Sequence, residues 1–166
     1  MKIKIYVASS WKNGYQPEIV QILRADGNDV YDFRQPVPGD DGFHWREIDP
    51  NWKAWTPEAY ARGLESPLAE KGYRADMTAL ENADLCVLVM PSGRSAAWEY
   101  GHWRGRTERH GVLYIPCNEA FEPELMFRGA TITWTVDGLI KAVRSKKAEL
   151  EELYSRPPMV VGGVSL

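Results

Sequence analysis

Cysteine and histidine are scarce in this sequence of 166 residues, which has two of the former and three of the latter. A disulfide framework or a structural zinc site needs more of these residues at ligand spacing. We therefore expect no metal site and no cofactor. Cys86 falls inside a predicted strand and Cys117 follows another, so both are expected to be reduced residues of the core.

Long apolar runs are missing as well. None approaches the roughly 20 residues that a transmembrane helix needs, and Met1 leads directly into a predicted strand rather than into a signal peptide. The net charge of −3 provides no general basic surface, although a local basic cluster is compatible with a small anionic ligand. We therefore expect a cytoplasmic protein that binds neither membranes nor nucleic acid polymers.

Strand-like and helix-like segments alternate along the chain. Strands are expected at residues 2–8, 29–33, 84–90, 111–115 and 130–134. Helices are expected at 17–25, 57–64 and 67–82, from 94 or 95 onward, and from 136 to about 153. This alternation predicts an α/β fold of three layers, with a flavodoxin/Rossmann-like, five-stranded parallel sheet and helices on both faces. Residues 1–156 are expected to form one domain, followed by a C-terminal tail at 157–166.

Aromatic residues are concentrated in the predicted loops. The chain has seven tryptophans, and four of them lie in or beside loops: Trp11, Trp45, Trp52 and Trp55. Such rings either cover the surface or an interface, or they form a lid that stacks on a planar base. Residues 34–56 are too many for a plain connection, and their aromatic content favours an ordered aromatic lid inserted into the domain.

The central stretch of the chain is a strand expected to be buried on both faces. Residues 85–90 are uninterruptedly apolar, and residues 91–93 read Pro-Ser-Gly. The helix that follows carries a single acidic residue, Glu99, near its start. Ligands usually bind at the carboxyl end of such a strand in an open parallel sheet.

Glu99 does not fit the common structural roles of a glutamate near a helix start. A capping box would need it three residues after Ser95, a position held by Trp98. A surface ion pair would need Lys or Arg three or four residues later, where His102 and Trp103 stand instead. A carboxylate that is poorly solvated and kept ionised by the helix dipole is suited to act as a nucleophile.

Two polar loops are expected at the same edge of the sheet. The first follows the first strand and the second follows the third; their polar residues are Ser9, Ser10, Lys12, Asn13, Ser92, Gly93, Arg94 and Ser95. Hydroxyls, backbone N–H groups and cations of this kind suit a phosphate or the hydroxyls of a sugar. Neither loop matches the P-loop or the dinucleotide-binding fingerprint, and ordinary turn chemistry remains an alternative.

Four segments of the sequence together resemble a known family. They are YVASSW from Tyr6, DMTALENAD from Asp76, CVLVMPSG from Cys86 and SAAWEYGHWRG from Ser95. In this order they resemble the nucleoside 2-deoxyribosyltransferase family and its hydrolase relatives, which cleave the N-glycosidic bond of nucleoside 5′-monophosphates. The resemblance covers residues 2 to about 143.

The resemblance implies roles for individual residues. Glu99 corresponds to the nucleophile, Asp76 to the acid that assists the leaving base, and Tyr6 to the aromatic residue that orients the nucleophile. The resemblance also implies that Met126 reaches a neighbour's active site, so a homodimer or higher homo-oligomer is expected. The residues expected to hold the base, sugar or phosphate are Ser9, Ser10, Trp11, Trp45, Ser92, Gly93, Arg94, Ser95 and Trp98.

The expected function is cleavage of the N-glycosidic bond of a (deoxy)nucleoside or nucleoside 5′-monophosphate through a covalent glycosyl-glutamate, with water or a second base as acceptor. The transferases carry an acid in the loop before the nucleophile, whereas this chain has serines there, like the nucleotide hydrolases. The transferases also have Asn where this chain has Glu124. Two alternatives remain open: a non-catalytic nucleotide-binding or sensing module, and an enzyme like the NAD glycohydrolases.

Overall fold

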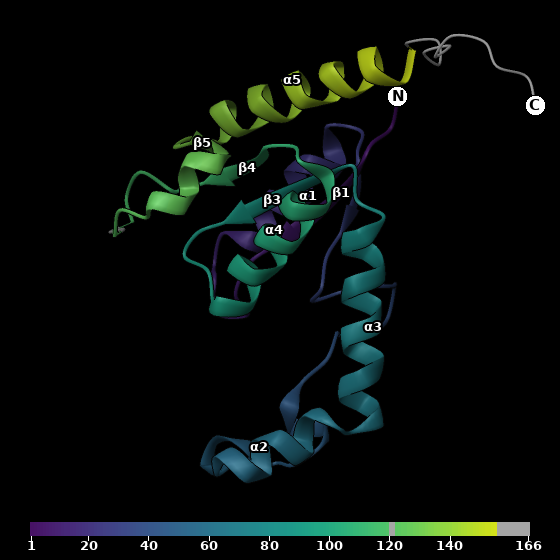
Figure 1. Cartoon of the computed structure of the whole chain (residues 1–166), viewed down its shortest axis with the longest axis vertical. Coiled ribbons are helices and arrows are strands. Elements are labelled where there is room, and N and C mark those ends of the chain that lie inside the picture. Colours follow the sequence, from purple (N-terminus) through teal and green to yellow (C-terminus); the bar gives the residue numbers. More distant parts are fainter. Residues whose placement is uncertain (120–121, 156–166) are drawn as a thin grey trace, which may run out of the picture.

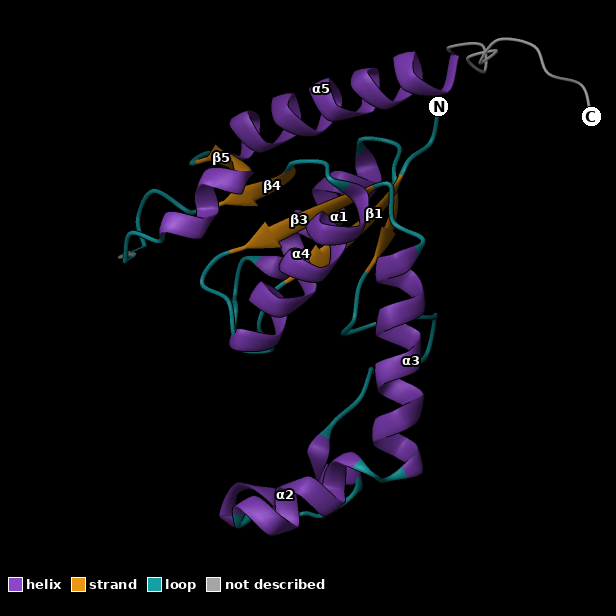
Figure 2. Ribbon diagram, in the orientation of Figure 1, coloured by secondary structure: helices purple, strands orange, loops and turns teal. Residues whose placement is uncertain are grey.

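Five parallel strands in the order β2-β1-β3-β4-β5 form the centre of the protein. The computed structural model describes residues 1–119 and 122–155, so the predicted tail at 157–166 lies outside the described residues. The strands are β1 (Lys4–Ala8), β2 (Asp29–Tyr31), β3 (Leu85–Val89), β4 (Gly111–Tyr114) and β5 (Ala130–Thr133). Helices cover both faces of the sheet, which confirms the predicted three-layer α/β fold (Figures 1 and 2).

The α-helices lie close to the predicted positions, and three short 3-10 turns accompany them. The α-helices are α1 (Gln16–Ala25), α2 (Pro57–Leu64), α3 (Pro67–Glu81), α4 (Arg94–Thr107) and α5 (Val136–Ser155). The 3-10 turns are η1 (Trp45–Glu47), η2 (Trp52–Ala54) and η3 (Leu125–Gly129). In the part of the chain that the structure describes, no helix has the length and the apolar character that crossing a membrane requires.

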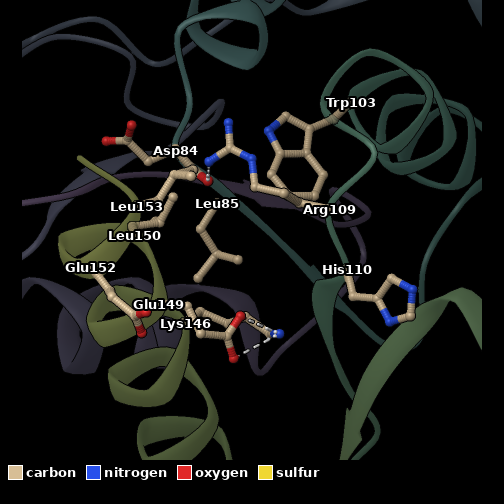
Figure 3. A pocket seen from close by; sticks show the side chains of 10 residues that line it. All are labelled: Asp84, Leu85, Trp103, Arg109, His110, Lys146, Glu149, Leu150, Glu152 and Leu153. Atoms are coloured by element: carbon tan, nitrogen blue, oxygen red, sulfur yellow. Dashed lines mark hydrogen bonds and ion pairs between the residues drawn. The ribbon is translucent and has the colours of Figure 1, made fainter. Parts of the chain in front are cut away.

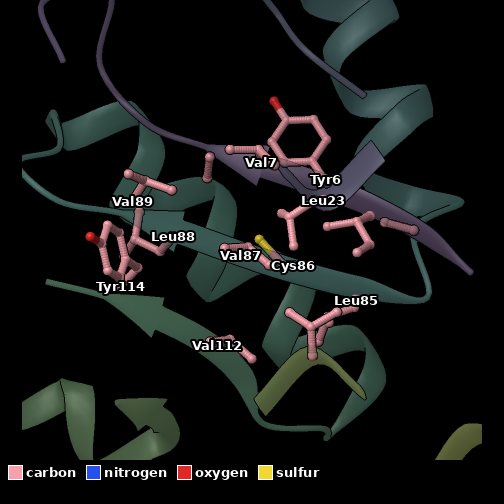
Figure 4. Close-up of a cluster of buried hydrophobic side chains, with 14 of the residues drawn as sticks. Tyr6, Val7, Leu23, Leu85, Cys86, Val87, Leu88, Val89, Val112 and Tyr114 are labelled. Carbon is pink, nitrogen blue, oxygen red and sulfur yellow. The ribbon is translucent and has the colours of Figure 1, made fainter. Parts of the chain in front are cut away.

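The core is built around β3, whose five residues are all buried. Its neighbours are buried as well, β4 along its whole length and β1 from its second residue onward, because helices pack on both faces of the sheet. Figure 4 shows the apolar side chains that these strands contribute. Leu88 is 1% exposed, and burying such a side chain contributes about 1.5–3 kcal/mol. Cys86 is buried as predicted, but the prediction for Cys117 is wrong. β4 ends at Tyr114, and the chain has reached the surface by position 117.

Each face of the sheet is covered by two helices. α1 and α5 lie on one face, where the Arg144 Nε of α5 donates to Asp26, the residue that ends α1, at 3.0 Å. α3 and α4 lie on the other face, where Arg106 forms an ion pair with Glu81 at 2.7 Å. Right-handed crossover connections produce this distribution in a sheet of this strand order.

α3 extends well beyond the edge of the sheet, and α2 lies at its far end (Figure 1). The segment 34–56 packs against both helices through close contacts that require glycine. A Cβ on Gly72 of α3 would lie 2.8 Å from the Cβ of Phe43, and a Cβ on Gly63 of α2 would lie 2.6 Å from the ring of Trp55. The segment is therefore held against the helices, as an ordered lid would be.

Candidate active site

A large cavity lies where the strand order reverses, beyond the carboxyl ends of β1 and β3. Its volume is about 760 Å³, within the range of ~300–1,000 Å³ that small-molecule sites occupy. Residues of β1, α3 and α4 line it together with the lid and α2. In open α/β sheets this crevice is the usual place for a ligand.

Two carboxyl groups from different helices face this cavity. Asp76 comes from α3 and Glu99 from α4, and the predicted pair therefore meets in one space. Burial raises the pKa of Glu99 to about 7, with a further rise from the charge of Asp76. Burial also raises the pKa of Asp76 to about 6. Two interacting carboxyls titrate as a pair, so between about pH 6 and pH 7 they hold about one proton between them.

Each carboxyl group has a tyrosine beside it. Tyr6 of β1 and Tyr31 of β2 are partners in the sheet register, and their rings stack with centroids 5.4 Å apart at an interplanar angle of 15°. The Tyr31 hydroxyl donates to Asp76 Oδ1 at 2.8 Å, and this bond lowers the pKa of Asp76 against the effect of burial. Sequence reasoning missed Tyr31, although its place in the second predicted strand beside Tyr6 was a usable signal.

The Tyr6 hydroxyl is fully buried and has no partner of regular hydrogen-bond geometry among the described residues. It points away from the cluster of apolar side chains beneath the ring (Figure 4). It nevertheless lies close enough to Glu99 to lower the pKa of that carboxyl. A buried hydroxyl that lines a cavity beside a carboxylate is a donor ready for use by a bound ligand or by Glu99 itself.

Aromatic rings form most of the remaining wall. The predicted residues Trp11, Trp45 and Trp98 all line the cavity. Trp11 is 44% and Trp98 is 53% exposed, and one face of Trp98 is stacked on His102 with ring centroids 5.1 Å apart. Four further aromatic residues, which were not predicted to bind a ligand, also line the cavity: Phe33, Phe43, Tyr60 and Tyr73.

The residues that are predicted to bind the sugar or the phosphate divide into two groups. Ser9, Arg94 and Ser95 line the cavity, with Arg94 and Ser95 in the first turn of α4. Such a helix start favours an anionic group. The Ser9 hydroxyl also donates to the Val89 carbonyl at 2.9 Å, which joins the ends of β1 and β3.

Ser10, Ser92 and Gly93 are not among the residues that line this cavity, and their role as substrate contacts stays a prediction. Local turn contacts occupy the two serine hydroxyls: Ser10 accepts from the Lys12 N–H at 3.2 Å, and Ser92 donates to the Met90 sulfur at 3.2 Å. Gly93 is the residue that precedes the first turn of α4.

Asn13 has a structural role between the two loops. It is 1% exposed, and its Nδ2 donates to the carbonyls of Val89 and Pro91 at 3.1 and 3.0 Å. Its Oδ1 accepts from the Tyr15 N–H at 2.7 Å, at the start of α1. Asn13 therefore fixes the loops that carry the site and does not face a ligand.

Met126 lies on η3, outside the cavity of its own chain. Its side chain is 82% exposed and its neighbour Leu125 is 83% exposed. The predicted role of Met126 in a neighbour's site stays a prediction, as does the homo-oligomer.

A second, smaller cavity of about 330 Å³ lies near the amino end of β3, where Leu85 begins the strand (Figure 3). Its charged groups already have partners: Lys146 pairs with Glu149 at 2.9 Å, and Arg109 donates to the Asp84 carbonyl at 3.0 Å. It is at the opposite edge of the sheet from Glu99 and takes no part in the candidate site.

Within residues 1–119 and 122–155, no three His, Cys, Asp or Glu side chains are grouped so that they could hold a metal ion. No protein-family model matches the chain, and no curated protein does either. The chemical groups that line the cavity are therefore the main indication of function.

Proposed function

We propose that the protein cleaves the N-glycosidic bond of a nucleoside or nucleoside 5′-monophosphate through a covalent glycosyl-Glu99. The observation that carries this proposal is the pair of carboxyl groups in one aromatic-walled cavity, with a buried hydroxyl beside Glu99. Paired carboxyls are the groups that glycosidic bond cleavage requires. The resemblance to the nucleoside 2-deoxyribosyltransferase family implies the same two residues as nucleophile and acid.

In the first step, the Glu99 carboxylate attacks C1′ of the sugar. The bond from C1′ to the base nitrogen breaks through an oxocarbenium-like transition state, and the base leaves with the proton of Asp76. In the second step, the Asp76 carboxylate takes a proton from water, and the resulting hydroxide attacks C1′ and releases Glu99. A second base in place of water gives transfer instead of hydrolysis.

In the free protein the proton of the pair lies mainly on Glu99, whereas the proposed roles need it on Asp76. Asp76 must hold a proton to act as an acid, and burial raises its pKa to about 6. Glu99 must be ionised to attack, and the Tyr6 hydroxyl opposes the effect of burial on its pKa. Because the pKa of Glu99 is the higher of the two, the proton must move to Asp76 when the substrate binds. Once Glu99 is ionised, its negative charge is favoured in the transition state, where positive charge develops at C1′.

The lining of the cavity supports a substrate that joins a flat base to a polar sugar. Trp11, Trp45 and Trp98 offer faces on which a base can stack. Arg94 and Ser95 offer a cation, a hydroxyl and the start of α4 to the hydroxyls of the sugar or to a 5′-phosphate.

The decisive experiment incubates the protein with nucleosides and nucleoside 5′-monophosphates, with and without a second free base. Free and exchanged bases are separated by chromatography. We expect release or exchange by the wild type, a loss of at least ~10³-fold in Glu99→Gln, and a loss of ~10²-fold or more in Asp76→Asn. Glu65→Gln, at an exposed position ending α2, is the matched control and should keep full activity.

Turnover that persists in Glu99→Gln would contradict the proposed mechanism. If no substrate is turned over while nucleotides still raise the melting temperature, the protein is a binding module instead. Release of nicotinamide from NAD, with no cleavage of any mononucleoside, would identify an enzyme like the NAD glycohydrolases instead.

A further inference from the structure

We infer that the substrate's base carries a bulky apolar substituent, which the outer half of the cavity binds. This inference rests on the proposed function, because it takes the position of the base from Glu99 and Asp76. The outer half is defined here by Phe43, Trp45, Tyr60, Leu64, Ala69 and Tyr73.

The cavity continues along α3 away from the two carboxyl groups. The residues of α3 that line it recur at helical spacing and so form one face: Ala69, Glu70, Gly72, Tyr73, Asp76, Met77 and Leu80. Asp76 and Ala69 are seven residues apart, which is about 10 Å along a helix axis. The cavity therefore reaches about two helical turns beyond the group that protonates the leaving base.

The walls of this outer half are apolar and largely preformed. Trp45 makes edge contacts with Trp55 and Tyr60, each with ring centroids 5.7 Å apart. Phe43 packs on Gly72 so closely that no side chain fits between them. These contacts hold the lid rings in place without a ligand.

Several apolar side chains at this end remain open to solvent. Tyr60 is 48%, Leu64 is 48% and Tyr73 is 56% exposed, and all three line the same cavity. Exposed apolar side chains that gather in one hollow, rather than singly over the surface, are typical of a ligand site.

The orientation of the substrate leaves only one part of it to fill this space. C1′ must lie at Glu99, and the base must lie where Asp76 protonates it. The sugar and any phosphate then lie toward Arg94 and Ser95 at the start of α4. The outer half is therefore reached by the edge of the base that is remote from the sugar.

The charges of the lining favour an apolar group over a second nucleotide. Of the described residues that line the cavity, Arg94 is the only cation, and it lies at the sugar end. The one charged residue near the outer half, Glu70, forms an ion pair with Arg74. A dinucleotide would place its pyrophosphate and second ribose against aromatic and aliphatic side chains that offer it no cation.

The experiment compares matched pairs of substrates that differ only in one benzyl group. Adenosine and cytidine, their 2′-deoxy forms and their 5′-monophosphates are each assayed with and without benzyl on the exocyclic nitrogen. We expect kcat/KM for base release to be about tenfold or more higher with the benzyl group, as burial of an aromatic ring implies.

Two variants test whether the outer half causes this preference. Leu64→Trp fills the far end of the cavity and should reduce the ratio of the two kcat/KM values by at least tenfold. Leu68→Trp is the matched control, because Leu68 is an exposed leucine of α3 that does not line the cavity; it should leave the ratio unchanged.

A ratio near one in the wild type, or a ratio that Leu64→Trp does not change, would overturn the inference while leaving bond cleavage intact. If no substrate of either kind is cleaved, the proposed function fails, and binding to Glu99→Gln decides the inference separately. Tighter binding of the benzyl compounds, weakened by Leu64→Trp, would support it; equal binding would overturn it.

Discussion

Removing the charge of Glu99 should stabilise the folded protein at alkaline pH while abolishing its activity. The carboxyl is mostly enclosed by the cavity, and burial together with Asp76 raises its pKa from an ordinary value of 4.5 to about 7. An ionised Glu99 is therefore disfavoured by the fold, and Glu99→Gln removes that cost. A residue retained for chemistry at the expense of stability is a common feature of active sites.

The direction and the size of this stability change follow from the linkage between proton binding and folding. Between pH 4.5 and about 7 the folded state keeps a proton on Glu99 that the unfolded state has lost. The free energy of unfolding therefore falls as the pH rises through this window and is level again above it. Each pKa unit corresponds to about 1.4 kcal/mol, so the full loss is about 3 kcal/mol. For a chain of this length that is a difference in melting temperature of about 6–12 °C.

The assay is urea and thermal unfolding of the wild type and Glu99→Gln at intervals from pH 4.5 to 8.5. The two proteins should have similar stability near pH 4.5 and separate progressively, with the variant more stable at pH 8. Glu65→Gln, the exposed control, should follow the wild type throughout. If the stability of the wild type and of Glu99→Gln depended on pH in the same way, the conclusion that Glu99 is a buried carboxyl with a raised pKa would be refuted.

Three further substitutions test the surroundings of the pair. Tyr31→Phe removes the hydrogen bond that lowers the pKa of Asp76, so the pH profile of kcat/KM should move to higher pH by about one unit, and an unchanged profile would contradict this. Tyr6→Phe removes the hydroxyl that lowers the pKa of Glu99, so kcat/KM at pH 7 should fall by about tenfold and recover in part at higher pH. Asn13→Ala removes both hydrogen bonds that the buried Asn13 amide donates, so that the Val89 carbonyl keeps only the Ser9 hydroxyl as a side-chain donor, and it should reduce the free energy of unfolding in urea by about 2 kcal/mol or more; a change within ±0.5 kcal/mol would mean that the two loops do not depend on it.

The periodicity of the sequence was sufficient to predict the sheet and most helix positions. The uninterrupted apolar run at β3 and the alternation of strands with helices leave few arrangements open, and α2 at Pro57–Leu64 begins at its proline as expected. The ends of strands were less predictable. The strand predicted at 29–33 pairs only over Asp29–Tyr31, because Asp32 turns to hydrogen bond with Gln16 of α1.

The site was predictable where a residue's chemistry was unusual for its position. Glu99 stood out because it fitted no local structural role, and it lines the cavity together with Asp76. Polar loop residues were harder to interpret, because a serine that binds a ligand and a serine that closes a turn look the same in the sequence. Ser10 and Ser92 make turn contacts. Only the fold decides which way their side chains point.

The outer half of the cavity was not predictable from the sequence. α3 is amphipathic, and its stripe of Tyr73, Met77 and Leu80 has the spacing of a core-facing surface. Leu80 is indeed buried, but Tyr73 is 56% exposed. The amino-terminal end of α3, beside α2, extends beyond the sheet (Figure 1). Helical periodicity identifies the apolar face but does not show where the sheet beneath it ends.

The most direct test of the central claim is the mass of the protein during turnover. The enzyme is mixed with the best substrate of the panel, quenched in acid within milliseconds to seconds, and analysed by intact-protein and peptide mass spectrometry. We predict a protein heavier by one glycosyl group, with the added mass on the peptide that contains Glu99, and no such species in Glu99→Gln. Base release without any glycosylated protein at any quench time, or a glycosyl group on another residue, would contradict Glu99 as the nucleophile.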